Sequence, residues 1–317
     1  MAQSKSKSFL GRETREYVDF IIGVDDSGKT ITYTSNPSAL ANFFGANPNA
    51  PNFLTQVHFR RDVLDKYYQK PSTYSVKSGI LHGGHEWGLP MDNNHEDKVC
   101  AWLGDLGRIP YDEQLHWRAH NIPPSGTLSE TFYANQILAT PTDSNRPDHL
   151  FMRSYDKLQK VWGENLSWSV LVPLSSDDSH HLQTLRIPST EEQREFDELV
   201  LSLTKVLIDS INEKKLKEVI PELCNDSSTS GLNVLERALQ SIGIENFSIH
   251  IHYLRKLQAL RSAGVAHRKG KRYEKLSSEL GIGSKSFRVV FAELLEGGTD
   301  YLDFLTSVAN DCRMHSS

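Results

Sequence analysis

A predicted helix end runs into a dense series of basic residues in the stretch Leu260-Arg261-Ser262-Ala263-Gly264-Val265-Ala266-His267-Arg268-Lys269-Gly270-Lys271-Arg272-Tyr273. Residues 255–275 hold eight Lys or Arg and one acid, although the whole chain has a formal net charge of −5. A positive segment on an acidic protein predicts an anionic partner. It is equally typical of a solvated helix end.

Arg261 and His267 are the residues of this stretch that could carry chemistry. An arginine and a histidine with five residues between them, at the end of a helix in an all-helical C-terminal region, resemble the signature of the HEPN superfamily. The resemblance implies a helical bundle that acts as a metal-independent endoribonuclease of a bacterial defence or toxin system, with Arg261 and His267 catalytic at a dimer interface. Ser262 departs from the family pattern, in which Asn, Asp or His often follows the arginine of active members. The alternative is a non-catalytic HEPN-like module for dimerisation and for binding nucleic acid or protein, in which both residues are structural.

The side chains suit RNA cleavage without a metal. His267 could move the proton of the 2′-hydroxyl, and Arg261 could stabilise charge on the phosphoryl group. The two residues lie about 240° apart around an ideal helix, so Gly264 is expected to end or bend it. Four basic residues are expected to bind the RNA phosphate backbone, and one aromatic residue is expected to stack on an RNA base. The basic residues are Arg268, Lys269, Lys271 and Arg272, and the aromatic residue is Tyr273.

The expected partners are RNA, a second copy of the chain and a protein of the same defence system. A two-fold dimer would supply two arginines and two histidines to a shared site. The apolar positions Leu254, Leu257 and Leu260 on a helix over 248–264 could form its interface, or they could fill the core of their own bundle.

Composition predicts an α+β protein of two domains, with a change near Pro188. All five Trp and eleven of the thirteen Pro precede this residue. We expect a disordered tail over residues 1–12, a strand-rich α+β sensor or regulatory domain over 13–187, and a HEPN-like helical bundle over 188–317. The N-terminal part otherwise resembles only uncharacterised bacterial proteins.

Local patterns predict individual elements. Before Pro188, β-rich runs at 17–24 and 30–34 flank a hairpin turn, 99–103 is a short apolar strand, and 111–120 and 61–68 are helices. After it, Ser189 and Glu192 have capping-box spacing, and one face of 190–215 is apolar. Further helices are predicted at 232–241, 248–264, 271–280 and 285–309, with breaks at Gly281, Gly283 and Gly297-Gly298.

Three other motifs are weighed against simpler explanations. Residues 23–30 match the P-loop pattern, but the following Ile31-Thr32-Tyr33-Thr34 alternates like a strand, so we interpret them as a hairpin. His116 and His120 have metal-ligand spacing, and His82, His85, Asp92 and His95 form a loose cluster, but surface or core histidines are the favoured interpretation. The glycine-rich loops 83–88 and 103–108, each beside a Trp, could shape a pocket or could be turns with Trp in the core.

The bulk properties indicate an ordinary globular protein in a reducing compartment. Three cysteines with no zinc-site spacing favour the cytoplasm. Residues 1–8 have no apolar core of a signal peptide, and no run of 18 apolar residues predicts a membrane span. No cofactor and no metal are expected.

Overall fold

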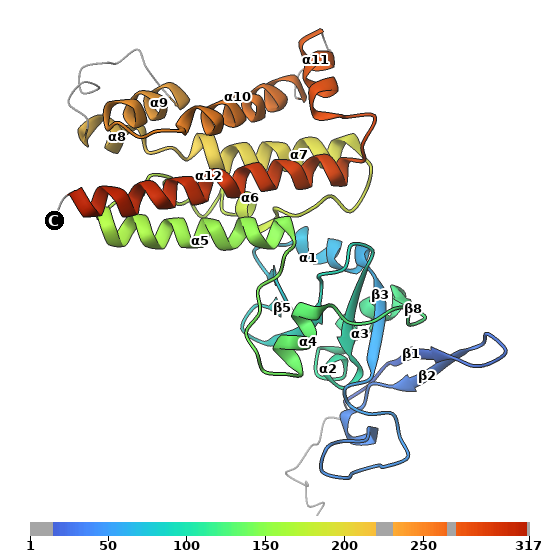
Figure 1. Ribbon diagram of the computed structural model, residues 1–317. Helices are drawn as coiled ribbons and strands as arrows, with labels where there is room; N and C mark the ends of the chain where they lie inside the picture. Colours follow the sequence, from blue (N-terminus) through green and yellow to red (C-terminus); the bar gives the residue numbers. More distant parts are fainter. Residues whose placement is uncertain (1–14, 220–230, 265–270, 316–317) are drawn as a thin grey trace, which may run out of the picture. The chain divides into compact units, whose positions relative to one another are not determined.

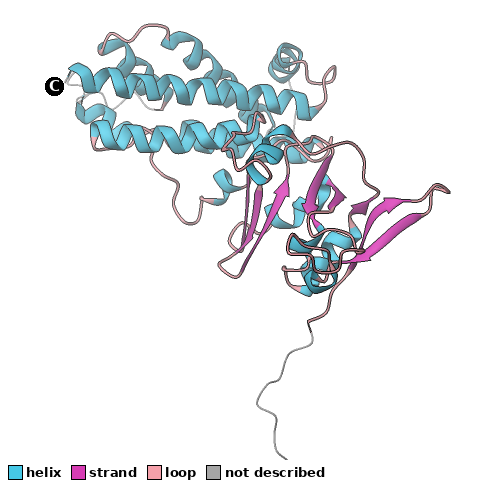
Figure 2. Cartoon of the chain, turned by 60° about the horizontal axis from the view of Figure 1, so that its bottom comes forward, coloured by secondary structure: helices cyan, strands magenta, loops and turns pink. Residues whose placement is uncertain are grey.

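The computed structural model describes residues 15–219, 231–264 and 271–315, and the chain divides into two compact units (Figure 1). The first unit holds the residues up to Leu64 together with Gly79–Pro141, and the second holds Asp65–Ser78 and Thr142–Ser317. All strands except β4 belong to the first unit, and the second is largely helical (Figure 2). The expected α+β class is confirmed. The tail expected over 1–12 lies outside the described residues.

The division of the chain differs from the boundary expected at Pro188. Helix α5 (Pro147–Leu166) belongs to the second unit, where it packs along α12 (Phe287–His315). Its Phe151, Tyr155 and Leu158 are buried in the same core as Leu302 of α12. Helix α5 was not among the predicted elements, although a proline at its first position and apolar residues at helical spacing mark it.

A hairpin of β1 (Asp19–Val24) and β2 (Thr30–Thr34) opens the first unit. In its turn the Asp25 carboxylate accepts hydrogen bonds from the Ser27 hydroxyl (2.6 Å), the Ser27 amide (2.9 Å) and the Lys29 amide (2.9 Å). The P-loop match is therefore followed by a strand, as the alternation predicts. A phosphate-binding loop would instead open a helix.

The main sheet of the first unit is antiparallel, with strands in the order β5-β6-β7-β3-β8. Its central strand β7 is buried along its whole length and confirms the strand predicted at 99–103. Trp117 of α3 packs edge-on against Phe59 of β3, with ring centroids 4.7 Å apart. The bounds are β3 (Gln56–Arg60), β5 (Ile80–Gly83), β6 (Trp87–Asp92), β7 (Lys98–Trp102), β8 (Asn121–Ile122), η1 (Pro37–Ala39), η2 (Arg61–Leu64), α2 (Leu103–Leu106), α3 (Tyr111–Ala119) and α4 (Glu130–Gln136).

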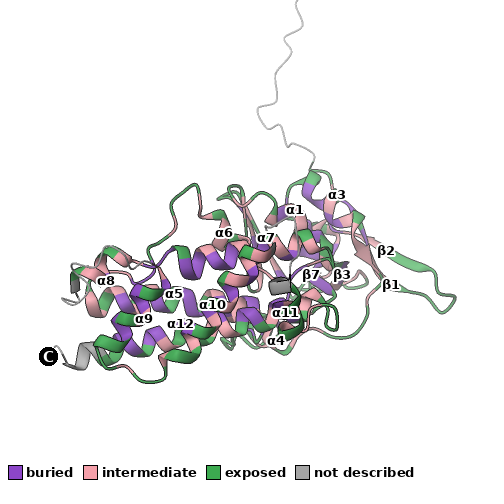
Figure 3. Cartoon of the chain, turned by 90° about the horizontal axis from the view of Figure 1, so that it is seen from above, coloured by how far each residue is buried: buried purple, intermediate pink, exposed green. Residues whose placement is uncertain are grey.

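The second unit is a helical bundle around one apolar core. Figure 3 shows buried residues along α5, α7, α10 and α12. Helices expected at 232–241, 248–264 and 271–280 are confirmed, the second beginning one residue earlier. The remaining bounds are α1 (Asp65–Tyr68), β4 (Tyr74–Lys77), α6 (His180–Gln183), α7 (Gln193–Thr204), the π-helical turn η3 (Lys205–Asp209), α8 (Glu213–Val219), α9 (Leu232–Ser241), α10 (Phe247–Gly264) and α11 (Lys271–Leu280).

The start of α7 corrects the predicted capping box. Glu192 is the N-cap residue and makes no side-chain cap, so the helix begins later than the Ser189 signal implies. Glu195 takes the reciprocal role instead. Its carboxylate accepts from the amide and hydroxyl of Ser189 (3.1 and 3.0 Å) and from those of Thr190 (2.8 and 2.7 Å).

Two further predictions are corrected by packing. Gly297-Gly298 does not break the chain but lies inside α12, where a Cβ on Gly297 would stand 2.7 Å from the Tyr253 ring. The pair therefore allows close helix contact. Leu254, Leu257 and Leu260 are buried in the core of their own unit, so they form no exposed interface. Gly281 and Gly283 do end α11, each with positive φ.

Candidate functional site

Arg261 lies in the last turn of α10 and is held by an acid from another element. Its Nη1 donates to both carboxylate oxygens of Asp209, at 2.9 and 2.8 Å. The Arg261 side chain is 31% exposed and that of Asp209 43%. Asp209 ends η3, whose Val206, Leu207 and Ile208 are buried. The wider π-helical turn thus keeps the apolar residues in the core while it presents Asp209 to Arg261.

A second group of polar residues lies near this ion pair. Lys205 of η3 donates to Asp178 at 2.9 Å. His181 of α6 contacts the Ser202 hydroxyl through Nδ1 at 3.0 Å, and its Nε2 lies 3.8 Å from Asp178. His180 lies against His181, with ring centroids 4.0 Å apart. A histidine, a lysine and the Arg261 guanidinium therefore lie near one another in the second unit.

The charges around His181 favour its neutral form. Burial lowers the pKa of His181, the charges of His180, Lys205 and Arg261 lower it further, and Asp178 opposes them. Arg261 is thus close enough for its charge to act on this ring. A histidine that stays neutral near pH 7 can accept a proton.

The other predicted site residues are only partly described. His267, Arg268 and Lys269 lie outside the described residues. Lys271, Arg272 and Tyr273 form the first turn of α11. Helix α10 is described up to Gly264, and the residues that would show the expected end or bend lie outside the described residues.

Sequence reasoning missed Asp178, His181, Ser202, Lys205 and Asp209. The only local signal was the doublet His180-His181 after two aspartates. The contacts join residues 178–181 to residues more than twenty positions later, and only the fold brings them together.

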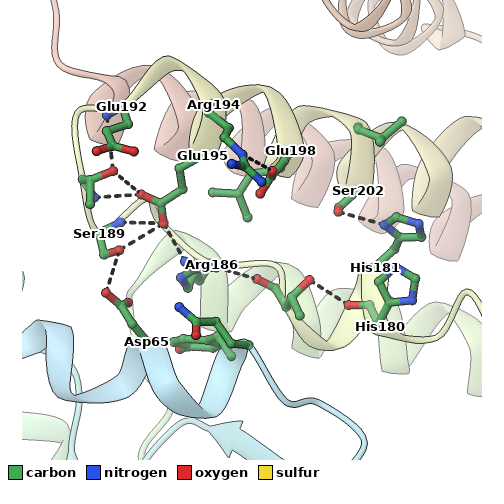
Figure 4. A pocket seen from close by; sticks show the side chains of 16 residues that line it. Asp65, His180, His181, Arg186, Ser189, Glu192, Arg194, Glu195, Glu198 and Ser202 are labelled. Carbon is green, nitrogen blue, oxygen red and sulfur yellow. Dashed lines mark hydrogen bonds and ion pairs between the residues drawn. The ribbon is translucent and has the colours of Figure 1, made fainter. Parts of the chain in front are cut away.

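A pocket of about 630 Å³ runs along α7 within the second unit (Figure 4). Arg186 lies in it, bonded to Glu195 at 2.5 Å, with its guanidinium 4.7 Å from the centre of the Tyr68 ring. Four acids and two arginines line it: Asp65, Glu192, Glu195, Glu198, Arg186 and Arg194. Burial alone would raise the pKa of Glu195. Hydrogen bonds from Thr190 and the charge of Arg186 outweigh burial, so the pKa is lowered and this acid stays ionised. His180, His181 and Ser202 also line the pocket, so it adjoins the polar group near Arg261, although its excess of acids opposes a phosphate backbone.

The histidines with metal-ligand spacing have structural contacts. His116 Nε2 lies 2.9 Å from the Val63 carbonyl, and His120 Nδ1 lies 3.0 Å from the His116 carbonyl. His95 pairs with the buried Asp92 at 3.2 Å. Among the described residues, no three His, Cys, Asp or Glu side chains are arranged to hold a metal ion.

The glycine-rich loop at 103–108 is explained by packing. A Cβ on Gly104 would stand 2.1 Å from the Phe53 ring, and one on Gly107 would stand 1.9 Å from the Ser35 carbonyl. Trp102 before them is 4% exposed and packs on Phe132. Residues 103–106 form the short helix α2 rather than a loop, and Trp102, although nearly buried, also lines a hollow of the first unit.

Comparisons with protein-family models, curated proteins and solved structures find no match for this chain. Among the described residues, no helix combines the length and the apolar character that crossing a membrane requires.

Proposed function

We propose that the second unit is a metal-independent, HEPN-like endoribonuclease in which Arg261 and His267 act on the RNA phosphate. The observation that carries the proposal is the setting of Arg261, in the last turn of α10 and seven residues before the basic run begins at Arg268. A role in a bacterial defence or toxin system, with the first unit as sensor, rests on the family resemblance.

The contact with Asp209 holds the Arg261 guanidinium in place and leaves part of it available for a ligand. Within the described residues, Nη1 makes both hydrogen bonds of the Arg261 side chain. The donors on Nε and Nη2 remain for a phosphate oxygen, and arginine keeps its charge at every relevant pH. A side chain already held in place loses less conformational entropy when it binds.

The chemistry needs a base for the 2′-hydroxyl, an acid for the leaving oxygen and a cation for the charged transition state. His267 supplies proton transfer and Arg261 supplies the cation. A second copy of the chain, bound through the second unit, would supply the second histidine.

One observation favours a second candidate, a non-catalytic nucleic-acid-binding or dimerisation module. The Arg261–Asp209 ion pair lies within a single chain, as a purely structural pair would. In this case the basic run binds nucleic acid and nothing is cut.

RNA cleavage in the presence of a chelator separates the two candidates. The assay compares wild type, Arg261→Ala and Arg255→Ala on total RNA. Arg255 is the matched control, because it lies on the same helix and pairs with Glu236 at 2.5 Å. The enzyme predicts cleavage that only Arg261→Ala abolishes. A wild type that binds RNA without cutting it overturns the enzyme and leaves the module.

A further inference from the structure

A serine, a histidine and an aspartate of the second unit form a series of contacts that the ribonuclease proposal does not use. The Ser202 hydroxyl lies 3.0 Å from Nδ1 of His181, and Figure 4 shows the two side chains facing each other. Through its other ring nitrogen, Nε2, His181 lies 3.8 Å from a carboxylate oxygen of Asp178. A nucleophile within hydrogen-bond reach of a base, which a third group orients, is the geometry by which enzymes activate a serine.

Two segments of the chain hold these side chains in place. Ser202 of α7 and Lys205 of η3 are three positions apart, so both side chains project to the same side of the helical backbone. Ser202 contacts His181 of α6, and Lys205 donates to Asp178, just before α6, at 2.9 Å. The lysine thus fixes the aspartate that faces the histidine, while the serine contacts the same ring through Nδ1.

The protonation state of His181 suits a base. The negative charge of Asp178 favours a proton on the nearer nitrogen, Nε2, which leaves Nδ1 to accept the proton of the Ser202 hydroxyl. Burial lowers the pKa of His181, and so do the neighbouring positive charges, against the one carboxylate. The charged or titratable side chains that act on the ring are His180, Lys205, Arg261 and Asp178. The ring is therefore unprotonated near pH 7 and able to take a proton.

The serine and the histidine both line the pocket of about 630 Å³ along α7, which is large enough for a small-molecule ligand. Ser202 is 6% exposed, as a nucleophile at the wall of a pocket is. Four carboxylates and two guanidinium groups line the same pocket, which leaves a formal excess of two negative charges with the histidines neutral. This charge favours a substrate that carries a positive charge.

We propose that Ser202 is the nucleophile and His181 the general base of an acyl-transfer site that hydrolyses esters of positively charged alcohols in this pocket. Ser202 Oγ forms a bond to the carbonyl carbon while its proton moves to His181 Nδ1. The ester C–O bond breaks, and the alcohol leaves with that proton. Water, activated by the same ring, then cleaves the acyl–serine ester and releases the acid. Asp178 is a positioning residue, because it orients the ring and does not touch the substrate.

A fluorophosphonate tests the nucleophile directly, because it forms a stable Oγ–P bond with an activated serine and releases fluoride. The full-length wild type should take up one label, which peptide mass mapping should place on Ser202. His181→Gln should slow the labelling by about 10²–10⁴-fold, the usual contribution of a general base. An unlabelled wild type, a label on another residue or an unchanged rate in His181→Gln overturns the proposal.

Ser154→Ala is the matched control. Ser154 is 5% exposed, and its hydroxyl donates to the carboxylate of Asp303 at 3.1 Å rather than to an imidazole. This variant should be labelled as fast as wild type, whereas Ser202→Ala should not be labelled. The activity is independent of the ribonuclease proposal, so RNA cleavage and serine labelling can fail separately.

The pH dependence of labelling tests the role of Asp178. The rate should rise with pH as His181 loses its proton. Asp178→Asn should move this rise to lower pH, because Asp178 raises the pKa of His181 against the other charges around the ring. An aspartate with only a structural role would change the amount of folded protein and leave the pH of half-maximal rate where it is, which would overturn its assignment.

Two esters of the same shape test the substrate class. Acetylcholine carries a positive charge, and 3,3-dimethylbutyl acetate is its neutral isostere. The kcat/KM for hydrolysis should be about tenfold higher for the cation at low salt, because the carboxylates of the pocket attract it. Equal values for the two esters, or a preference for the neutral one, would overturn the assigned substrate class.

Discussion

Arg261 and Arg255 both lie on α10 and both form an ion pair, but they lie at different places along the helix. Each is paired with a single carboxylate, Asp209 or Glu236. Only Arg261 lies at the helix end, where its charge also acts on His181. Half-exposed ion pairs contribute at most about 1 kcal/mol to stability. The Arg261 pair therefore matters more for where it places charge than for folding.

Removing the Asp209 charge should strengthen RNA binding. A unit charge about 4 Å away in water is worth about 1 kcal/mol, so Asp209→Asn should tighten RNA binding roughly fivefold at low salt. The effect should fade as salt rises. Fluorescence anisotropy measures it, with Glu236→Gln as the variant of equal charge change. Equal tightening in both variants would show that Arg261 has no special place in binding.

His58 provides a pH test of the first unit. Burial lowers the pKa of His58 to about 4, with help from Lys98 and His95 and against Asp92. Its Nδ1 accepts from the Ser125 amide at 3.3 Å, which requires the neutral ring. The unfolded chain binds a proton below its ordinary pKa of about 6.5, and the folded chain does not until about pH 4.

Stability is therefore complete above about pH 6.5 and falls as the pH drops toward 4, by up to about 3 kcal/mol from this group. His58→Gln should flatten that slope. Thermal unfolding from pH 4.5 to 7.5 checks it in both proteins. Parallel curves for wild type and variant would rule out His58 as the cause.

At the scale of elements, the sequence pattern predicts those helices whose formation depends on neighbouring residues along the chain. The helices at 232–241 and 271–280 are marked by apolar spacing and by glycines at their ends. The π-helical turn η3 is not marked, because it depends on how Val206, Leu207 and Ile208 meet the rest of the core. The sequence predicts a helix break at Gly297-Gly298, because it cannot show that aromatic rings from other helices pack against these glycines.

The same contrast applies to the candidate site. A helix over 248–264 that carries Arg261 near its last described residue follows from the sequence. Asp209 and His181 do not, since no spacing rule relates residues joined only by tertiary packing.

Alanine at Gly297 should destabilise the bundle, although alanine normally favours a helix by about 1 kcal/mol. Its Cβ would stand 2.7 Å from the Tyr253 ring, and such overpacking costs about 1–3 kcal/mol. Gly163 of α5 is the control, because a Cβ there meets nothing within 4 Å. Gly163→Ala should raise the melting temperature and Gly297→Ala should lower it. A rise in both would mean that α10 and α12 lie further apart.

At the scale of the whole molecule, charge is distributed unevenly. The chain has a formal net charge of −5, yet residues 255–275 are strongly basic. The pocket along α7 is acidic, whereas the end of α10 leads into that basic run. If the proposed RNA binds, long-range charge should direct it to the basic residues of 255–275.

The most direct test of metal-independent cleavage is the single-turnover rate on a defined RNA with EDTA present. Wild type should cut the RNA and leave its 2′-O-methyl counterpart intact, because the 2′-oxygen is the nucleophile. His267→Ala should be slower by about 10²–10⁴-fold, the usual contribution of a general acid or base. Cleavage that requires a divalent metal and persists in His267→Ala would contradict the account.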